Sequence, residues 1–555
     1  MNLNSRLAIR IFQFLKARGV DEICVCPGAR NSPLIAVLTS NSESFQSHYF
    51  FEERSAAFFA LGRMRNTGKP VAVMTTSGTA AGELLPAAME AHYSSLPLIL
   101  LTADRPRTYR GSGAPQAAEQ VGLFGLYVSH SIDLEREGDL DINIPLLNRP
   151  LHLNACMSEP LIDLDSDLKI PRMRLERKFH SVAEQLEFAP TPHEITHFLK
   201  KVRNPLVLVG MVLPGERESV AQLLMQWQVP AYLEGISGLR EDPRLKPYRI
   251  SVCDQLLERA LAENYEVDGV IRIGGVPTLR LWRDLESKYA SLPVLSLTHT
   301  PFSGLSRKNS TIHGDLNLLC KEVGNHLNPR NIKIVSYLSE RFLISDRELT
   351  HRLDELLQSE PCSESGMIAA LSKRMPSNSR VYLGNSLPIR EWDLVAERDD
   401  LDFPKSRRFK DTWASRGVNG IDGQVSTFLG FAEPGEENWA LVGDLTALYD
   451  LSAPWILAQL KNSQVTIVIV NNGGGKIFSK MFPQVEFQNQ HQLNFHAWAE
   501  LWGLRYEKWT KVPGNIEKAV QSRIIEMVPD PEATRRFWDQ YQILLKKGDQ
   551  KQCQK

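Results

Sequence analysis

Two short apolar runs near the carboxyl end of the chain limit most strongly what it can fold into. Trp439–Val442 and Val465–Val470 lack polar alternation, which is typical of strands that a parallel sheet buries on both faces. The segment that joins them is long enough for the crossover that parallel strands need, and it carries Leu448, Leu451 and Trp455 at helical spacing. The sequence therefore predicts two neighbouring parallel strands with a helix between them.

Polar residues and glycines follow both predicted strands, as Gly443-Asp444-Leu445-Thr446 and Asn471-Asn472-Gly473-Gly474-Gly475. Because open α/β sheets bind ligands beyond the carboxyl ends of their strands, we expect Asp444 and Asn472 to share one crevice. Together with the backbone carbonyl of Gly474 they offer hard oxygen ligands suited to Mg²⁺, and the glycines would let the backbone approach a bound diphosphate. An ordinary strand, turn and helix stays possible, because Asp caps helices and Asn-Gly forms turns.

The composition bounds the class of protein. A chain of 555 residues has room for roughly three domains of ordinary size. The net charge of −1 gives no reason to expect nucleic acid or an anionic membrane as a partner. Seven cysteines without a repeated C-x-x-C favour a reducing cytosol over a disulfide framework. No uncharged apolar stretch reaches the roughly 18 residues that a membrane span needs, so we expect a cytoplasmic protein.

Alternating strand and helix signals predict three successive α/β domains with mainly parallel sheets, at residues 1–180, 190–335 and 345–555. The stretch Leu168–Pro192 is interpreted as a linker. The expected strands are Glu22–Cys26, Val71–Thr75, Leu98–Thr102, Leu206–Gly210, Gly269–Ile273, Val294–Leu297, Val381–Leu383 and Ile524–Val528, with helices at Ser32–Thr39, Glu52–Arg65 and Thr79–Tyr93. The middle domain has no G-x-G-x-x-G; its most specific feature is the turn Gly274–Arg280.

The spacing of 28 positions between Asp444 and Asn472 resembles the Gly-Asp and Asn-Asn signature of thiamine diphosphate enzymes. Leu445 stands where that signature commonly has a glycine. Such a cofactor needs a buried carboxyl group at its pyrimidine ring, so that its own amino group can remove a proton. Glu53 is the candidate, although an acid in a first helical turn, like its neighbour Glu52, more often offsets the helix dipole.

Further motifs occur in an order that resembles the menaquinone-pathway family of 2-succinyl-5-enolpyruvyl-6-hydroxy-3-cyclohexene-1-carboxylate synthases, the MenD family. These motifs are Cys26–Pro33, Phe51–Arg54, Thr76–Ala80, Leu101–Pro106, Gly113–Ala117, Gly384–Arg390 and Ser415–Gly423. The resemblance covers nearly the whole chain. It implies pyrimidine-binding, central and diphosphate-binding domains, with thiamine diphosphate and Mg²⁺, or Mn²⁺, as cofactors.

The resemblance also implies roles for single residues. Glu53 would activate the cofactor, Ile421 would hold it in a bent conformation, and Asp444, Asn472 and Gly474 would bind the metal. The implied cofactor-binding residues are Glu53, Thr79, Ser386, Ile421, Gly443, Asp444, Thr446, Asn472, Ile477 and Phe478. The residues implied in substrate recognition and catalysis, besides Glu53, are Arg30, Gln116, Arg280, Arg390 and Arg416.

The implied reaction is decarboxylation of 2-oxoglutarate followed by conjugate addition of the succinyl carbanion to isochorismate. Both substrates are dicarboxylates, which agrees with several arginines that could bind carboxylates in a bidentate manner. The resemblance implies a homodimer or a dimer of dimers, in which Glu53 and Asp444 meet from different subunits.

Two departures and two alternatives remain. Ala29 and Pro115 replace a serine and an asparagine that are common in the MenD family, and each replacement removes a possible hydrogen bond near the second substrate. The chain could instead be another thiamine diphosphate enzyme, such as an acetohydroxyacid synthase or a 2-oxo acid decarboxylase. It could also be a non-catalytic relative that serves as a binding scaffold.

Overall fold

A computed structural model describes residues 1–142, 144, 148–162, 167–171, 192–326, 337–399, 408–479 and 481–550. Most of the predicted linker Leu168–Pro192 lies outside these residues. The chain forms two compact units, each described here by itself. Unit 1 comprises residues 1–185, 415–435 and 446–463, and unit 2 comprises residues 186–414, 436–445 and 464–555. Among the described residues, no helix combines the length and apolarity needed to cross a membrane.

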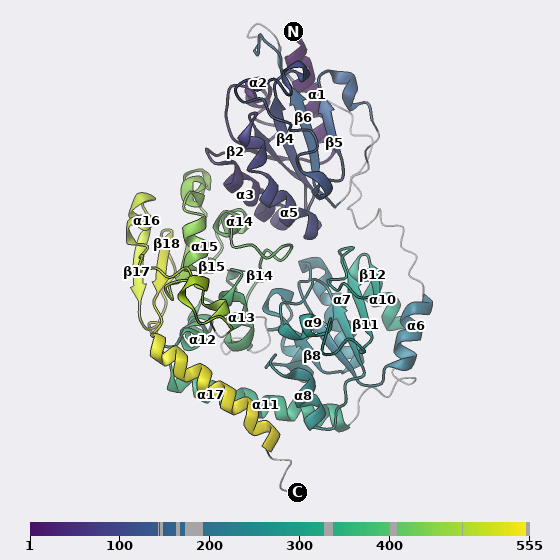
Figure 1. Ribbon diagram of the computed structural model, residues 1–555, viewed down its shortest axis with the longest axis vertical. Coiled ribbons are helices and arrows are strands. Elements are labelled where there is room, and N and C mark those ends of the chain that lie inside the picture. Colours follow the sequence, from purple (N-terminus) through teal and green to yellow (C-terminus); the bar gives the residue numbers. More distant parts are fainter. Residues whose placement is uncertain are drawn as a thin grey trace. The chain divides into compact units, whose positions relative to one another are not determined.

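The first sheet lies in unit 1 and has six parallel strands in the order β2-β1-β3-β4-β6-β5 (Figure 1). The strands are β1 (Glu22–Val25), β2 (Gln46–Tyr49), β3 (Val71–Thr75), β4 (Leu98–Asp104), β5 (Ser131–Leu134) and β6 (Leu151–Cys156). Helices α1 (Leu3–Ala17) and α2 (Ser32–Ser40) share one apolar core with this sheet, and α3 (Glu53–Thr67) packs with α5 (Leu85–Tyr93). The expected helix Thr79–Tyr93 is wrong in its continuity, because α4 (Thr79–Gly82) ends shortly before Pro86 and α5 starts anew.

The chain crosses from one side of β1 to the other, which creates a switch point between β1 and β3. Here the turns after the two strands touch. A Cβ at Gly28 would lie 2.5 Å from the Cβ of Thr76, so only glycine fits. The predicted motifs around these two residues therefore meet at the carboxyl edge of the first sheet.

The second sheet, in unit 2, has the order β12-β11-β10-β7-β8-β9. Its strands are β7 (Pro205–Val209), β8 (Ala231–Leu233), β9 (Arg249–Ile250), β10 (Gly269–Ile273), β11 (Val294–Thr298) and β12 (Ser310–His313). At its switch point, a Cβ on Gly210 would lie 2.3 Å from the carbonyl oxygen of Gly275. The two loops thus pack backbone against backbone at the switch point, which is where open α/β sheets commonly bind nucleotides.

The third sheet, also in unit 2, has the order β14-β13-β15-β16-β18-β17. Its strands are β13 (Arg380–Leu383), β14 (Asp411–Trp413), β15 (Asn438–Gly443), β16 (Val465–Val470), β17 (Arg505–Trp509) and β18 (Arg523–Met527). β15 and β16 are parallel, with Gly443 opposite Val470, which confirms the two strands predicted from the apolar runs. All three expected α/β sheets are therefore present and parallel.

The predicted helix between β15 and β16 is wrong in its continuity. The crossover consists of α15 (Asp444–Tyr449) and a separate 3-10 helix, η8 (Ala453–Gln459). Leu451 and Trp455, which stand at helical spacing in the sequence, are each 42% exposed. The break has a physical cause: Pro454 lacks the N–H that a continuing helix requires.

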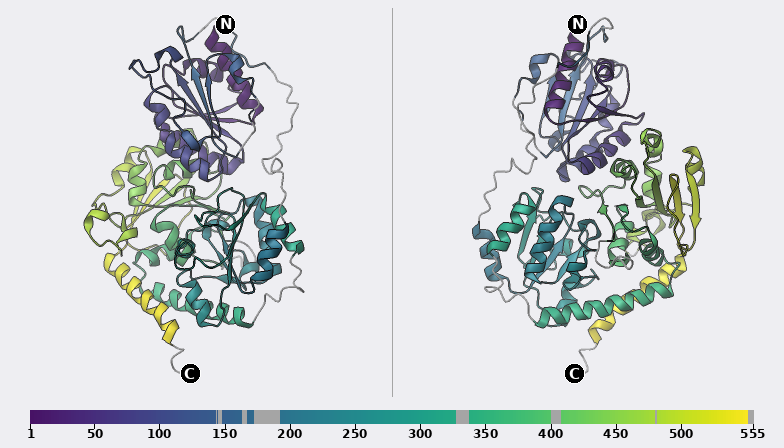
Figure 2. Two further views of the ribbon diagram at one scale, coloured as in Figure 1. Left: turned by 45° about the vertical axis from the view of Figure 1, so that its right-hand side comes forward. Right: turned by 180° about the vertical axis from the view of Figure 1, so that it is seen from behind.

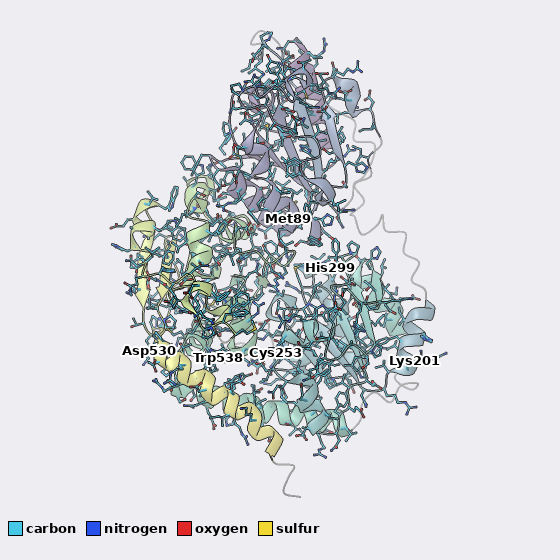
Figure 3. The ribbon with its side chains drawn as sticks, viewed as in Figure 1. Met89, Lys201, Cys253, His299, Asp530 and Trp538 are labelled. Atoms are coloured by element: carbon cyan, nitrogen blue, oxygen red, sulfur yellow. The ribbon has the colours of Figure 1, made fainter. Side chains whose placement is uncertain are left out.

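The remaining helices complete the layers around the sheets. They are α6 (Pro192–Lys201), α7 (Arg217–Trp227), α8 (Leu256–Ala262), α9 (Arg280–Asp284), α10 (Leu316–His326), α11 (Tyr337–Ser359), α12 (Glu364–Arg374), α13 (Leu387–Val395), α14 (Gln424–Phe431), α16 (His496–Leu501) and α17 (Pro531–Gln550). α11 and α17 lie side by side (Figure 2). On α17, the rings of Phe537 and Tyr541 stack with their centroids 6.1 Å apart. Trp538, labelled in Figure 3, packs edge-on against Tyr541.

Helices α3 and α14 pack unusually closely within unit 1. A Cβ on Gly62 would lie 2.1 Å from the carbonyl oxygen of Thr427, and one on Gly430 would lie 2.1 Å from that of Phe59. Each glycine faces the backbone of the other helix, so neither position can carry a side chain.

Gly62→Ala should therefore destabilise the protein by about 1–3 kcal/mol, because the backbones must separate to admit the methyl group. Gly82→Ala is the control, since nothing lies within 4 Å of a Cβ at that position. Thermal unfolding of both variants beside the wild type gives the comparison. Equal midpoints for Gly62→Ala and the wild type would contradict the packing described.

Candidate functional site

The carboxyl ends of β15 and β16 are joined through Asp444. Its Oδ2 accepts hydrogen bonds from the backbone N–H groups of Gly473 (2.9 Å) and Gly474 (2.8 Å), and its Oδ1 accepts one from Leu445 (2.6 Å). Burial raises the pKa of the Asp444 carboxyl, while these hydrogen bonds favour its charged form. The two glycine-bearing turns therefore meet at one place, as expected from the strand order.

Asn472 has its two amide ends in different environments. Its Nδ2 donates to Oε2 of Glu364 at 2.9 Å. Its Oδ1 is buried and accepts no hydrogen bond from the described residues. A buried amide oxygen without a donor, close to a carboxylate-bearing turn, is an arrangement that a hard cation would complete.

The glycines of this turn adopt conformations that other residues avoid. Gly473 has φ +80° and Gly474 has φ +135°, and a Cβ on Gly474 would lie 2.5 Å from the carbonyl oxygen of Gln488. Among the described residues, no group of three or more His, Cys, Asp or Glu side chains forms a metal cluster. A ligand set of one carboxylate, one amide and one carbonyl fits Mg²⁺, which takes its other ligands from water and phosphate.

The other predicted residues near the third sheet differ in backbone conformation and exposure. Ser386 is the N-cap residue of α13 and has φ +74°, and the Arg390 guanidinium donates to its carbonyl. Phe478 is 47% exposed at the end of a short 3-10 helix. The other predicted cofactor residues here are Gly443 and Ile477, both half-buried, and Thr446, which is buried.

At the first sheet, the structure separates the roles of Glu52 and Glu53. Glu52 is the N-cap of α3, and its carboxylate accepts from the N–H groups of Arg54 (3.0 Å) and Ser55 (3.1 Å). It also accepts from the Ser452 hydroxyl at 2.9 Å. Glu52 therefore caps α3, whereas Glu53, in the first turn of the helix, is not needed as a cap.

Glu53 is half-buried at the first position of α3. Burial raises the pKa of its carboxyl above the usual value, and the nearby charges of Glu52 and Glu83 raise it further. A carboxyl group in this state can hold a proton near neutral pH more readily than an exposed one. This is the electrostatic environment expected for the activating glutamate.

The other predicted residues of the first domain lie at the same sheet edge but differ in exposure. Arg30 is 8% exposed, donates to the carbonyl of Met157 at 2.9 Å and pairs with Glu159 at 3.3 Å. Thr79, at the start of α4, and Gln116 are exposed. Arg30 is thus tied into the domain, whereas the other two present their side chains to the outside of unit 1.

The turn that carries Arg416 is held by a residue that the sequence did not identify. Glu90, on α5, is 3% exposed, and its carboxylate accepts from the N–H groups of Gly417 (2.7 Å) and Val418 (2.8 Å). Arg416 and Ile421, on either side of these amides, are half-buried. Glu90 thereby fixes the backbone between two predicted site residues.

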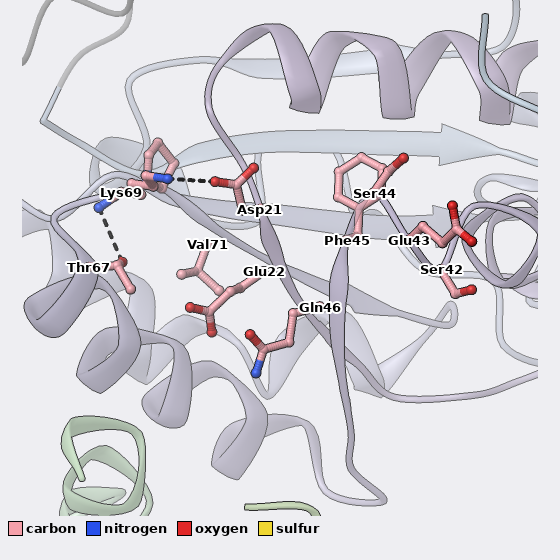
Figure 4. A pocket seen from close by; sticks show the side chains of 11 residues that line it. Asp21, Glu22, Ser42, Glu43, Ser44, Phe45, Gln46, Thr67, Lys69 and Val71 are labelled. Carbon is pink, nitrogen blue, oxygen red and sulfur yellow. Dashed lines mark hydrogen bonds and ion pairs between the residues drawn. The ribbon is translucent and has the colours of Figure 1, made fainter. Parts of the chain in front are cut away.

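Two further features are a solvent-exposed Arg280 in unit 2 and a cavity in unit 1. Arg280 has a side chain that is 73% exposed, and it forms an ion pair with Asp284, one turn further along α9, at 3.5 Å. A cavity of about 610 Å³ opens at the amino edge of the first sheet, opposite the predicted site, beside Asp21 and Lys69 (Figure 4). These two residues form an ion pair of 2.7 Å across its rim.

Glu22, which also lines the cavity, is held by buried ionic contacts. Burial raises the pKa of its carboxyl, but hydrogen bonds from His48 and Arg63 outweigh burial and lower it to about 2. Arg63 binds both carboxylate oxygens, at 2.7 and 2.8 Å. Two of the carboxylates that line the cavity, those of Asp21 and Glu22, therefore already have partners.

Sequence reasoning missed Glu90, Glu364 and His491. His491 Nε2 lies 3.3 Å from Asp444 Oδ2, and its Nδ1 accepts a hydrogen bond from the N–H of Leu493. None of the three stands in a glycine-bearing turn, and their partners are distant in the sequence. The position of Glu364 directly after Ser363 gave no signal, because an acid in a first helical turn usually offsets the helix dipole.

Glu90→Ala should loosen the turn at residues 417 and 418. Losing a buried acceptor for two amides costs about 1–3 kcal/mol per unsatisfied group, so their hydrogen exchange should accelerate by about tenfold or more. Glu83→Ala, which removes an exposed acid near the same helix, is the control. Unchanged exchange in Glu90→Ala, measured by mass spectrometry, would show that another contact holds the turn.

Sequence and structure comparisons with known proteins point to the same class of enzyme as this geometry. Residues 6–123 match the family model described as thiamine pyrophosphate enzyme, N-terminal TPP binding domain. An X-ray structure of a candidate thiamin diphosphate-dependent enzyme from Mycobacterium smegmatis superimposes with a TM-score of 0.67, covering 96% of this chain and 100% of that one. Its sequence is 15% identical, so it supports the fold.

Two curated relatives are much closer in sequence, and both bear the name 2-succinyl-5-enolpyruvyl-6-hydroxy-3-cyclohexene-1-carboxylate synthase. The protein from Bdellovibrio bacteriovorus is 44% identical over 98% of this chain and 99% of its own length. The protein from Akkermansia muciniphila is 37% identical over 94% of this chain and 95% of its own length. The chain therefore belongs to the 2-succinyl-5-enolpyruvyl-6-hydroxy-3-cyclohexene-1-carboxylate synthase family, a family of thiamine diphosphate-dependent enzymes.

Proposed function

We propose that this protein decarboxylates 2-oxoglutarate and adds the resulting succinyl carbanion to isochorismate, giving 2-succinyl-5-enolpyruvyl-6-hydroxy-3-cyclohexene-1-carboxylate and carbon dioxide in menaquinone biosynthesis. The observation that carries the proposal is the 44% identity, over almost the full length of both chains, to a relative with that name. The reaction class is carboligation, so the enzyme is a transferase.

The proposed metal is Mg²⁺, with Mn²⁺ as a substitute, held by Asp444, Asn472 and the carbonyl of Gly474. The buried and unpartnered Oδ1 of Asn472 supports this set. Asp444 is fixed before any cation arrives, because two glycine N–H groups already bind its carboxylate. Such preorganisation lowers the cost of assembling the site.

Thiamine diphosphate, when bound, supplies the electron sink for decarboxylation. The chain supplies a carboxyl group at Glu53, whose raised pKa suits it to hold a proton against the pyrimidine ring. Arg30, Gln116, Arg280, Arg390 and Arg416 are proposed to recognise the substrates. The arginines offer paired donors for the carboxylates, and Arg416 has the best supported backbone because Glu90 binds the adjacent turn.

A homodimer, or a dimer of dimers, is the proposed assembly, with the protein in the cytoplasm. The segment after Asn472 supports the assembly, because it exposes apolar side chains that a partner would cover. These are Phe478, Met481, Phe482, Val485 and Phe487, each 44–56% exposed. The six cysteines within the described residues are all free, which supports a reducing compartment.

Carbon dioxide release from 2-oxoglutarate tests the function. With thiamine diphosphate and Mg²⁺ present, isochorismate should strongly stimulate release, because the carbanion then has an acceptor. Pyruvate in place of 2-oxoglutarate should give little release. Turnover of pyruvate with no effect of isochorismate would instead indicate an acetohydroxyacid synthase-like enzyme.

Glu53→Gln should reduce this turnover by on the order of a hundredfold or more, because the amide cannot exchange a proton with the pyrimidine ring. Glu52→Gln is the matched control one residue away: it weakens the cap of α3 and costs about 1 kcal/mol of stability, while turnover of the folded enzyme persists. Initial rates and thermal midpoints of both variants separate the two effects. A Glu53→Gln enzyme with wild-type turnover would exclude Glu53 as the activating group.

A further inference from the structure

Glu364 is a buried acid that the proposed site does not yet account for. It is 3% exposed at the first position of α12, in unit 2. The N-cap of that helix is Ser363, whose hydroxyl accepts from the N–H of Gly366 at 2.9 Å. The carboxylate of Glu364 is therefore not needed for capping.

The backbone of Glu364 is fixed by a second helix. Its N–H donates to the hydroxyl of Thr534, on α17, at 3.0 Å. Asp530, which precedes α17 (Figure 3), caps this helix by accepting from the N–H of Ala533 at 2.8 Å, and its own N–H donates to the carbonyl of Cys362 at 2.9 Å. Two helix starts thus hold the acid in one place.

The carboxylate of Glu364 determines which way the amide of Asn472 faces. Its Oε2 lies 2.9 Å from Asn472 Nδ2, and in its ionised form the carboxylate can only accept, so it binds the NH₂ end of the amide. The other amide end, Oδ1, consequently points elsewhere, and no described residue donates to it. If the amide turned over, its NH₂ group would face the cation site and repel the metal.

We propose that Glu364 is a positioning residue for the metal: it holds the Asn472 amide so that Oδ1 is presented to the cation. This inference rests on the metal site proposed above. Residues that orient metal ligands in this way typically change metal affinity by about 10–100-fold when they are removed.

The test measures the affinity of Mn²⁺ for the full-length protein in the presence of thiamine diphosphate, by electron paramagnetic resonance of the free ion. Glu364→Ala should weaken Mn²⁺ binding by about 10–100-fold. Glu364→Gln should weaken it less, because the glutamine amide can still accept but no longer enforces one orientation. Glu360→Gln is the control: Glu360 is a neighbouring acid that pairs with Arg536 at 2.8 and 2.9 Å.

A double-mutant cycle separates orientation from a general structural effect. Asn472→Asp alone should weaken Mn²⁺ binding, because two carboxylates would then face each other at hydrogen-bond distance. Adding Glu364→Gln should restore much of the affinity, since the glutamine NH₂ group can donate to one oxygen of the new carboxylate and leave the other for the metal. A role of Glu364 in folding alone predicts no such rescue.

The outcomes distinguish this inference from the proposed function. If the wild type binds Mn²⁺ but the double variant binds no better than Asn472→Asp, the orienting role is overturned while the metal site stands. Wild-type affinity in Glu364→Ala would overturn it equally. If the wild type itself does not bind Mn²⁺ with thiamine diphosphate, the metal site is wrong and this inference falls with it.

Discussion

The hydrogen bonds from Gly473 and Gly474 to the Asp444 carboxylate are the interaction on which the candidate site depends. They join the turns after two strands, in which Asp444 and Asn472 lie 28 positions apart. These hydrogen bonds are possible only because β15 and β16 are parallel and in register. The turn after β16 needs glycine: the backbone of Gly474 has φ +135° and leaves no room for a Cβ. Sheet order, backbone conformation and charge therefore act together at one point.

At two helix N-termini, one residue caps the helix and the acid that follows it is not used as a cap. Glu52 caps α3 and leaves the carboxyl of Glu53 available, while Ser363 caps α12 and leaves that of Glu364 available. In each pair the capping residue binds amides of the first turn, and burial raises the pKa of the adjacent acid, which is half-buried in Glu53 and buried in Glu364. Burying such an acid costs stability, which suggests that both acids are kept for what they bind.

The sequence predicted the interior strands well because continuous apolar runs such as Gly269–Ile273 have few other uses. Among the strands it missed, β5, β14 and β17 lie at sheet edges, where polar residues alternate or dominate, as in Arg505–Trp509. Turns with glycines were located correctly, but the contacts that orient them were not. Glu90 and Glu364 act across 327 and 108 residues, and no local pattern reveals such partners.

The interleaving of the two units has a practical consequence for recombining related enzymes. Residues 415–435 and 446–463 belong with the first sheet, although they flank β15 of the third. α14 reaches its place through glycine contacts with α3 that tolerate no added atom. A chimera joined at residue 345 would therefore combine an α3 and an α14 of different parentage. In a library of hybrid enzymes, α3 and α14 should come from the same parent. The contact between these two helices, rather than the ends of the sheets, sets where segments can be exchanged.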